Sequence, residues 1–161
     1  MILILAYGNS LRRDDGAGFV LAKTLEELLA EAGVAVERLE SHQLAPELAL
    51  DISKEDVSAV VFVDTRAVSD RNADLSLHAE KILPADIASP SVGHSLDPSV
   101  LLAYTKYLFK KNPPAWLLTI PGIDFEHGEG FSKAVQKLLD EAPGRLRKFV
   151  DTVAQESAIA R

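Results

Sequence analysis

Polar side chains that could do chemistry are gathered in short segments directly after apolar runs of the sequence. Asp14 and Asp15 follow the first run, Asp64 follows a central one, and later segments add His94 and Asp124. Two carboxylates and an imidazole suit a borderline divalent metal such as nickel or zinc, and an incomplete protein shell leaves positions for water or for groups from a partner. Spacing alone does not group these residues, because they lie far apart along the chain.

Such residues need a scaffold that brings the ends of the apolar runs together. Strand-like segments alternate with helix-like ones, and Val57–Val63 is a nearly continuous β-branched and aromatic run that predicts a strand buried on both faces, as in parallel sheets. In open α/β sheets, ligands collect outside the carboxyl ends of the strands, which is where the polar segments fall. The sequence therefore predicts one α/β domain over residues 1–161, a three-layer α/β/α sandwich around a twisted, mostly parallel, five-stranded sheet.

The predicted boundaries come from periodicity and from residues that begin or end helices. The expected strands are Ile2–Tyr7, Val34–Leu39, Val57–Val63, an exposed edge strand Leu75–Leu83, and Ala115–Ile120. The expected helices are Asp15–Ala32, Pro46–Ile52, one that begins with Asp97 as N-cap and Pro98, one from Ser132 to about Leu139, and a last one after a break at Pro143-Gly144.

Composition excludes several classes of site. The 161 residues include no cysteine, which rules out disulfides, thiolate metal sites and a cysteine nucleophile. A net charge of −7 without a basic stripe argues against a nucleic-acid partner. The first apolar run is only a strand's length and has no basic leader, so we expect neither a signal peptide nor a membrane span, and a cytoplasmic protein.

The order of the polar motifs resembles that of the hydrogenase maturation endopeptidases. The segment Gly8-Asn9-Ser10-Leu11-Arg12-Arg13-Asp14-Asp15-Gly16-Ala17-Gly18 after an N-terminal strand is similar to that family's first motif. Asp64 and His94 correspond to its second and third motifs, and the segment 122–132 is similar to its last. Three positions depart from the usual pattern: Ala6 replaces a glycine, Asp15 replaces a longer glutamate, and Arg66 replaces a small residue.

The resemblance implies an endopeptidase that removes a short C-terminal extension from the large-subunit precursor of a [NiFe]-hydrogenase after nickel insertion. It places the metal contacts on Asp15, Asp64 and His94, with nickel supplied by the substrate and no organic cofactor. Asp15 and Asp64 are the expected catalytic residues. The partner would be the precursor, and we expect the free protein to be a monomer.

Other residues receive roles beside these. Gly8 and Asn9 form a tight turn that lets a substrate backbone approach, and His42 lies in a segment similar to one near the family's substrate cleft, so all three are candidate substrate contacts. Asp14 is expected to cap the following helix. His78 is expected to be solvated on the edge strand, and His127 is the first substitute if His94 is not a ligand.

Three alternatives stay open. Asp64 could serve only as a structural acceptor for a loop backbone. The same ligands could belong to a non-catalytic protein that checks or delivers nickel for metalloenzyme assembly. A phosphate- or nucleotide-binding α/β hydrolase is a third possibility, but the first loop lacks G-x-G-x-x-G and carries two acidic residues where a pyrophosphate would lie.

Overall fold

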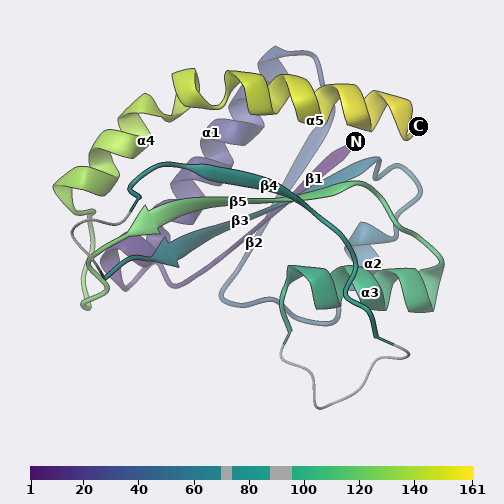
Figure 1. Cartoon of the computed structure of the whole chain (residues 1–161), viewed down its shortest axis with the longest axis horizontal. Helices are drawn as coiled ribbons and strands as arrows, with labels where there is room; N and C mark the ends of the chain where they lie inside the picture. Colours follow the sequence, from purple (N-terminus) through teal and green to yellow (C-terminus); the bar gives the residue numbers. More distant parts are fainter. Residues whose placement is uncertain (70–73, 88–95) are drawn as a thin grey trace.

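The computed structural model describes residues 1–69, 74–87 and 96–161. Its strands are β1 (Ile2–Tyr7), β2 (Val36–Ser41), β3 (Ala59–Ala67), β4 (His78–Ile82) and β5 (Ala115–Gly122). They form one sheet in the order β2-β1-β3-β5-β4, parallel except for β4, which pairs antiparallel with β5 at the edge (Figure 1). The predicted mostly parallel, five-stranded sheet and its exposed edge strand are confirmed.

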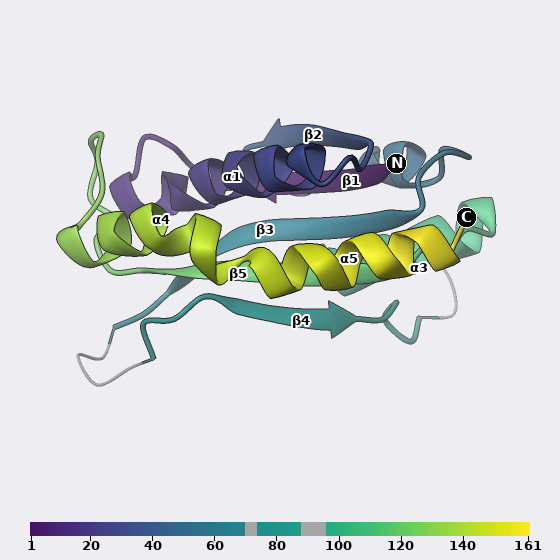
Figure 2. The ribbon, with the colours of Figure 1, turned by 90° about the horizontal axis from the view of Figure 1, so that it is seen from above.

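Helices cover both faces of the sheet. They are α1 (Ala17–Glu31), preceded by a short 3₁₀ turn η1 (Arg13–Gly16), then α2 (Leu48–Ile52), α3 (Pro98–Phe109), α4 (Lys133–Arg145) and α5 (Arg147–Ile159). Helices α1, α4 and α5 lie on one face, and α2 and α3 lie on the other (Figures 1 and 2). No helix of the described residues is both long and apolar enough to cross a membrane.

Alternate side chains of the central strands supply two separate cores. Ile2 and Ile4 of β1 pack in the core under α1, α4 and α5, whereas Leu3 and Leu5 pack in the core with α2 and α3. All four side chains are essentially without solvent exposure, and each such burial contributes about 1.5–3 kcal/mol. The two cores hold β1, β3 and β5 rigidly, so the loops at their carboxyl ends start from fixed points.

Local sequence determines where α3 begins. Asp97 accepts a hydrogen bond from the N–H of Val100 at 2.9 Å, and Pro98 occupies the first turn, both as predicted. The predicted second strand, Val34–Leu39, is shifted: β2 begins at Val36 and ends at Ser41. Its ends are determined by parallel pairing with β1, which joins Ile2 to Val36 and Tyr7 to Ser41.

The predicted break between the last two helices is present, but it lies at Leu146 and not at Pro143-Gly144. Helix α4 continues through Pro143 to Arg145, and α5 begins at Arg147. Proline removes one backbone donor, but Ala142 and Leu146 on either side of it are buried in the core above the sheet. The apolar stripe that packs on α1 therefore stabilises the helix across the proline.

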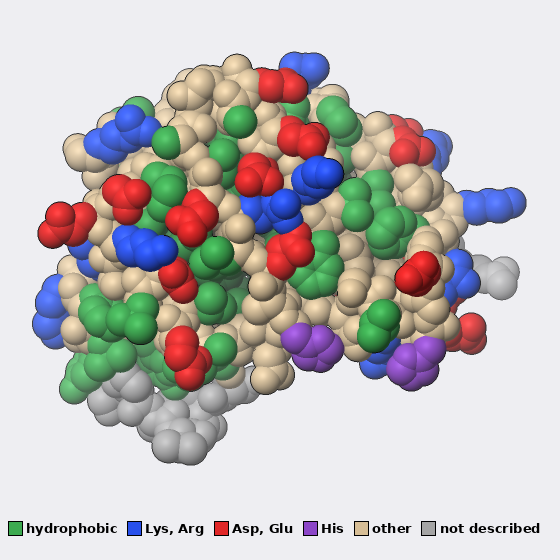
Figure 3. Space-filling model, turned by 180° about the vertical axis from the view of Figure 1, so that it is seen from behind, with side chains coloured by type: hydrophobic (Ala, Val, Ile, Leu, Met, Phe, Trp, Pro, Cys, Tyr) green, Lys and Arg blue, Asp and Glu red, His purple; other side chains and the backbone are tan. Residues whose placement is uncertain are grey.

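Acidic and basic side chains are interspersed on the face seen from behind (Figure 3). This agrees with a sequence that carries 24 acidic and 17 basic residues without a basic stripe. The face gives no sign of the single-sign patch that nucleic-acid binding requires.

Candidate active site

The loop after β1 folds back so that Asp15 lies against the end of that strand. The carboxylate Oδ2 of Asp15 accepts a hydrogen bond from the N–H of Asn9 at 2.7 Å. Gly8 has a φ of +153°, and a Cβ there would lie 2.7 Å from the carbonyl oxygen of Asp15. Only glycine permits this approach, so Gly8 and Asn9 together position Asp15.

Thr65 joins this loop to β3. Its hydroxyl accepts a hydrogen bond from the N–H of Gly18 at 3.1 Å and donates to the carbonyl of Asp15 at 3.4 Å. Gly18 also permits close packing, because a Cβ there would lie 3.4 Å from the carbonyl carbon of Asp64. The start of α1 is thereby placed directly on β3, beside Asp64.

Asp64 lies within β3, not after it. The prediction that the strand ends at Val63 is wrong, because β5 pairs with β3 as far as Ala67 and Gly122. The side chain of Asp64 is half-buried on the α2–α3 face, and its Oδ1 accepts a hydrogen bond from the N–H of Thr65 at 2.7 Å. This donor is a neighbouring residue of the strand, so the predicted alternative, a structural acceptor for a loop backbone, stays a prediction.

Burial raises the pKa of Asp64 to about 6. The N–H of Thr65 acts against this rise, the charge of Asp15 adds to it, and a hydrogen bond from Tyr7 partly offsets it. Burial, followed by the charge of Asp64, raises the pKa of Tyr7, so its phenol keeps its proton and donates to Asp64. The structure therefore brings Asp15 close enough for its charge to act on Asp64, and none of the ion pairs between described residues includes Asp64.

This coupling predicts opposite shifts in two variants. Asp15→Asn is expected to lower the pKa of Asp64, because it removes a neighbouring negative charge, whereas Tyr7→Phe is expected to raise it, because it removes a donor to the ionised carboxylate. Carboxyl ¹³C NMR titration of the free protein measures both shifts, and the wild type should titrate near pH 6. Asp151→Asn on the outer surface of α5 is the control. Shifts of the same sign in the two variants would contradict the geometry.

Asp14 is not the helix cap that the sequence predicts. Its side chain has no solvent exposure and accepts four hydrogen bonds from the last loop. The donors are the N–H of Ile123 (2.9 Å), of Asp124 (2.9 Å) and of Ser132 (2.8 Å), and the Ser132 hydroxyl (2.7 Å). Ser132 does stand at the N-cap of α4, as predicted, but its hydroxyl is used by Asp14. Asp14 therefore joins the loop after β1 to the last loop, whereas Asp15 faces the candidate site.

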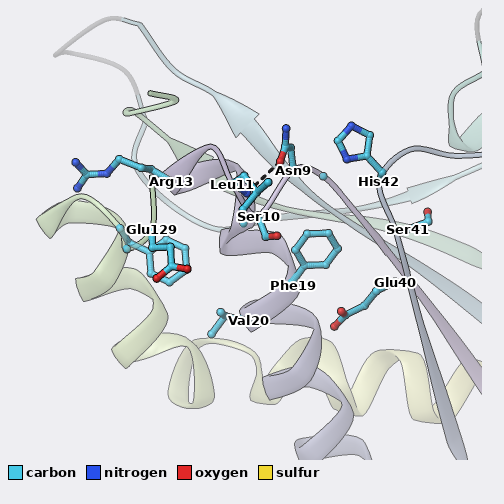
Figure 4. A pocket seen from close by; sticks show the side chains of 14 residues that line it. Asn9, Ser10, Leu11, Arg13, Phe19, Val20, Glu40, Ser41, His42 and Glu129 are labelled. Atoms are coloured by element: carbon cyan, nitrogen blue, oxygen red, sulfur yellow. Dashed lines mark hydrogen bonds between the residues drawn. The ribbon is translucent and has the colours of Figure 1, made fainter. Parts of the chain in front are cut away.

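Two grooves adjoin the carboxylate pair. The first, the first-loop groove, has a volume of about 730 Å³ and lies among the loop after β1, the start of α1, the end of β2 and residues 129–131. It brings together the three predicted substrate contacts, Gly8, Asn9 and His42, and Asn9 and His42 lie next to each other above the ring of Phe19 (Figure 4). The Asn9 Oδ1 accepts from the N–H of Leu11 at 3.0 Å, and its amide nitrogen has no acceptor among the residues that the structure describes.

The second groove, the edge groove, has a volume of about 670 Å³ and includes Asp64 itself. Its other lining residues come from β3, β4, β5 and the approach to β4: Arg66, Leu77, His78, Ala79, Glu80, Leu117 and Thr119. Asp15 bonds to Asn9 of the first-loop groove and acts on Asp64 of the edge groove. Asp64 thus lines the edge groove, whereas Asp15 reaches the first-loop groove only through its contact with Asn9.

The predicted third ligand, His94, lies outside the described residues. Within residues 1–69, 74–87 and 96–161, no three acidic or histidine side chains are gathered closely enough to hold a metal ion. His127 is exposed in the last loop and lines neither groove. His78 is exposed on the edge strand, as predicted, and it also lines the edge groove with Asp64, with its Nε2 2.6 Å from Oδ2 of Asp74. Only the antiparallel register of β4 on β5 places His78 there, and the sequence carries no sign of that register.

Solved structures of hydrogenase maturation proteases share this fold. HybD from Escherichia coli, a hydrogenase maturating endopeptidase, superimposes with a TM-score of 0.63 and 20% identity over 94% of this chain and 92% of that chain. The maturation protease HycI from Thermococcus kodakarensis KOD1 gives 0.59 and 18% over 95% and 92%. HybD from Thermococcus kodakarensis gives 0.57 and 18% over 92% and 98%. No protein-family model and no curated protein sequence matches the chain. At such identities the likeness establishes a common fold.

Proposed function

We propose that this chain is an endopeptidase that removes the C-terminal extension of a [NiFe]-hydrogenase large-subunit precursor after nickel insertion, in the cytoplasm. The observation that carries the proposal is the pairing of Asp15 with Asp64 at the carboxyl end of the sheet. Two separate segments meet to make this pair, and Gly8 permits the close approach of the one that carries Asp15. The fold that it shares with solved maturation proteases supports the same function.

The carboxylate pair suits the recognition of a metal that arrives with the substrate. Burial and the charge of Asp15 raise the pKa of Asp64, and both effects disfavour its negative charge in the free protein. A divalent cation such as nickel compensates that charge when the precursor enters, and Asp15, Asp64 and His94 supply the oxygen and imidazole contacts that it prefers. A precursor without nickel would leave the pair uncompensated, so nickel loading controls binding.

Hydrolysis then adds water across one peptide bond of the precursor. A carboxylate of the Asp15–Asp64 pair that does not contact nickel would activate the water by accepting its proton. Nickel in the substrate would polarise the scissile carbonyl. Gly8, Asn9 and His42 line the first-loop groove, where the peptide of the precursor would bind. The products are the shortened large subunit and a short peptide.

Co-expression with candidate precursors, with and without nickel, tests the proposal. The mass of the large subunit is expected to fall by a C-terminal peptide only in the nickel-loaded sample. Nickel-dependent binding without any change in mass would instead support a protein that checks or delivers nickel. Cleavage that does not depend on nickel would contradict the role given to the carboxylate pair.

A further inference from the structure

Arg66 faces the same groove as Asp64 and has no part in the mechanism above. The two residues are separated by one position on β3, so their side chains lie on the same face of the sheet, and both line the edge groove. The guanidinium is held in place by three acceptors. Nη1 donates to the hydroxyl of Thr119 at 3.1 Å, and Nη2 donates to the carbonyls of Asp74 at 2.9 Å and Ser76 at 3.1 Å.

These contacts orient Arg66 without neutralising it. All three acceptors are uncharged groups, and none of the ion pairs between described residues includes Arg66. A guanidinium has five N–H donors, so Nε–H and one N–H of Nη1 have no acceptor within the described part of the chain. A fixed positive charge with spare donors therefore faces the groove.

The other charged groups around the edge groove leave this charge available. The carboxylate of Asp74 is bonded to Ser76 and His78, and only its backbone carbonyl contacts Arg66. Glu80 is exposed and pairs with Leu117 of β5. Leu117 lies two residues before Thr119 and so further from the carboxyl end of that strand. The end of the groove nearest Asp64 is thus the end where the guanidinium is anchored.

We propose that Arg66 binds a carboxylate of the substrate's C-terminal segment and so positions the scissile bond at the Asp15–Asp64 pair. This inference rests on the proposed peptidase function and specifies which substrate tails it accepts. Arginine suits the role, because its planar fork can bond neighbouring carbonyls and an incoming carboxylate at once, and a side chain already held in place loses little entropy on binding. The carboxylate belongs either to an acidic side chain of the tail or to its free C-terminus.

Steady-state cleavage of a nickel-loaded precursor by Arg66→Gln and Arg66→Lys tests the proposal. Three precursors are compared: the native tail, a tail whose acidic side chains are replaced by amides, and a tail ligated with a C-terminal carboxamide. With the native tail, Arg66→Gln is expected to raise KM by about tenfold to a hundredfold with kcat nearly unchanged. Arg66→Lys should fall between Arg66→Gln and the wild type. The rise in KM caused by Arg66→Gln should disappear with the tail that lacks the carboxylate bound by Arg66. That tail shows whether the carboxylate is an acidic side chain or the free C-terminus.

Arg66 also joins β3 to the segment before β4 through the carbonyls of Asp74 and Ser76. A purely structural role of Arg66 therefore has to be distinguished from substrate binding. A loosened groove would reduce cleavage of all three precursors by the same factor, and that result would overturn the proposal, as would an unchanged KM. Arg145→Gln on α4, whose guanidinium bonds Glu141, is the control. If Arg66→Gln does not fold, Arg66→Lys carries the comparison. A wild-type protein that cleaves no precursor would contradict the proposed function itself.

Discussion

Asp64→Asn is expected to lower the rate of precursor processing by at least about a hundredfold without lowering the stability of the protein. Asparagine has the shape of aspartate and keeps an oxygen that can accept from the N–H of Thr65 and from Tyr7. It lacks the negative charge that would contact nickel and the basicity that would activate water. The mass of the co-expressed large subunit measures the loss, and Asp15→Asn should behave in the same way.

The expected stability of Asp64→Asn means that lost processing can be assigned to lost chemistry and not to unfolding. The pKa of Asp64 is raised from 3.8 to about 6 in the folded protein, so ionisation of this carboxyl opposes folding at pH 7. The contribution of Asp64 to stability is greatest below pH 3.8 and is lost as the pH rises through 6. An uncharged isostere should therefore melt no lower than the wild type at pH 7. Asp151→Asn, an exposed aspartate of α5, is the control for both measurements. Full processing by both Asp15→Asn and Asp64→Asn would exclude the proposed mechanism.

The sequence predicts the scaffold of this site well because the scaffold depends on patterns that are local. The apolar run of β3, the alternation on the edge strand β4 and the cap at Asp97 each need only a few neighbouring residues. Parallel strands place their carboxyl ends on one side, so the loops after β1 and β3 were expected to meet. The choice of Asp15 and Asp64 among the polar residues of these loops came from the family resemblance, because spacing alone does not group them.

What the sequence did not predict depends on pairing between distant segments. The exact register of β4 on β5 places His78 level with Thr119 and gives Asp64 a groove that no motif indicates. The anchoring of Arg66 by Thr119 requires the same register. Pro143 reads as a helix end because proline lacks a donor, and only packing on the sheet shows that the helix continues.

Asp14 is the residue for which tertiary structure most changes the prediction. An aspartate beside a helix start fits the sequence pattern of a helix cap. The hydrogen-bond donors that Asp14 uses instead lie 109 to 118 positions away along the chain. Burial alone would raise the pKa of Asp14, but the N–H groups of Asp124, Ser132 and Ile123 and the Ser132 hydroxyl lower it below 3.8. The ionised carboxylate is thus the form that the folded protein binds.

Asp14→Asn is therefore expected to reduce the free energy of unfolding at neutral pH by about 3 kcal/mol, because an amide group replaces an acceptor that faces buried donors. For a chain of this size that loss corresponds to a fall in melting temperature of about 6–12 °C. Asp140→Asn, an exposed aspartate of α4, should change the melting temperature little. Calorimetry or thermal circular dichroism of the three proteins measures the difference.

The pH dependence separates a buried carboxylate from a simple loss of packing. A carboxyl whose pKa is lowered on folding contributes its stability above its unfolded pKa, and that contribution is lost as the pH falls through the folded pKa. The gap between wild type and Asp14→Asn should therefore be widest near neutrality and should narrow below about pH 4. A gap that stays constant down to pH 2–3 would mean that the charge of Asp14 is not what holds the last loop against the loop that carries Asp15.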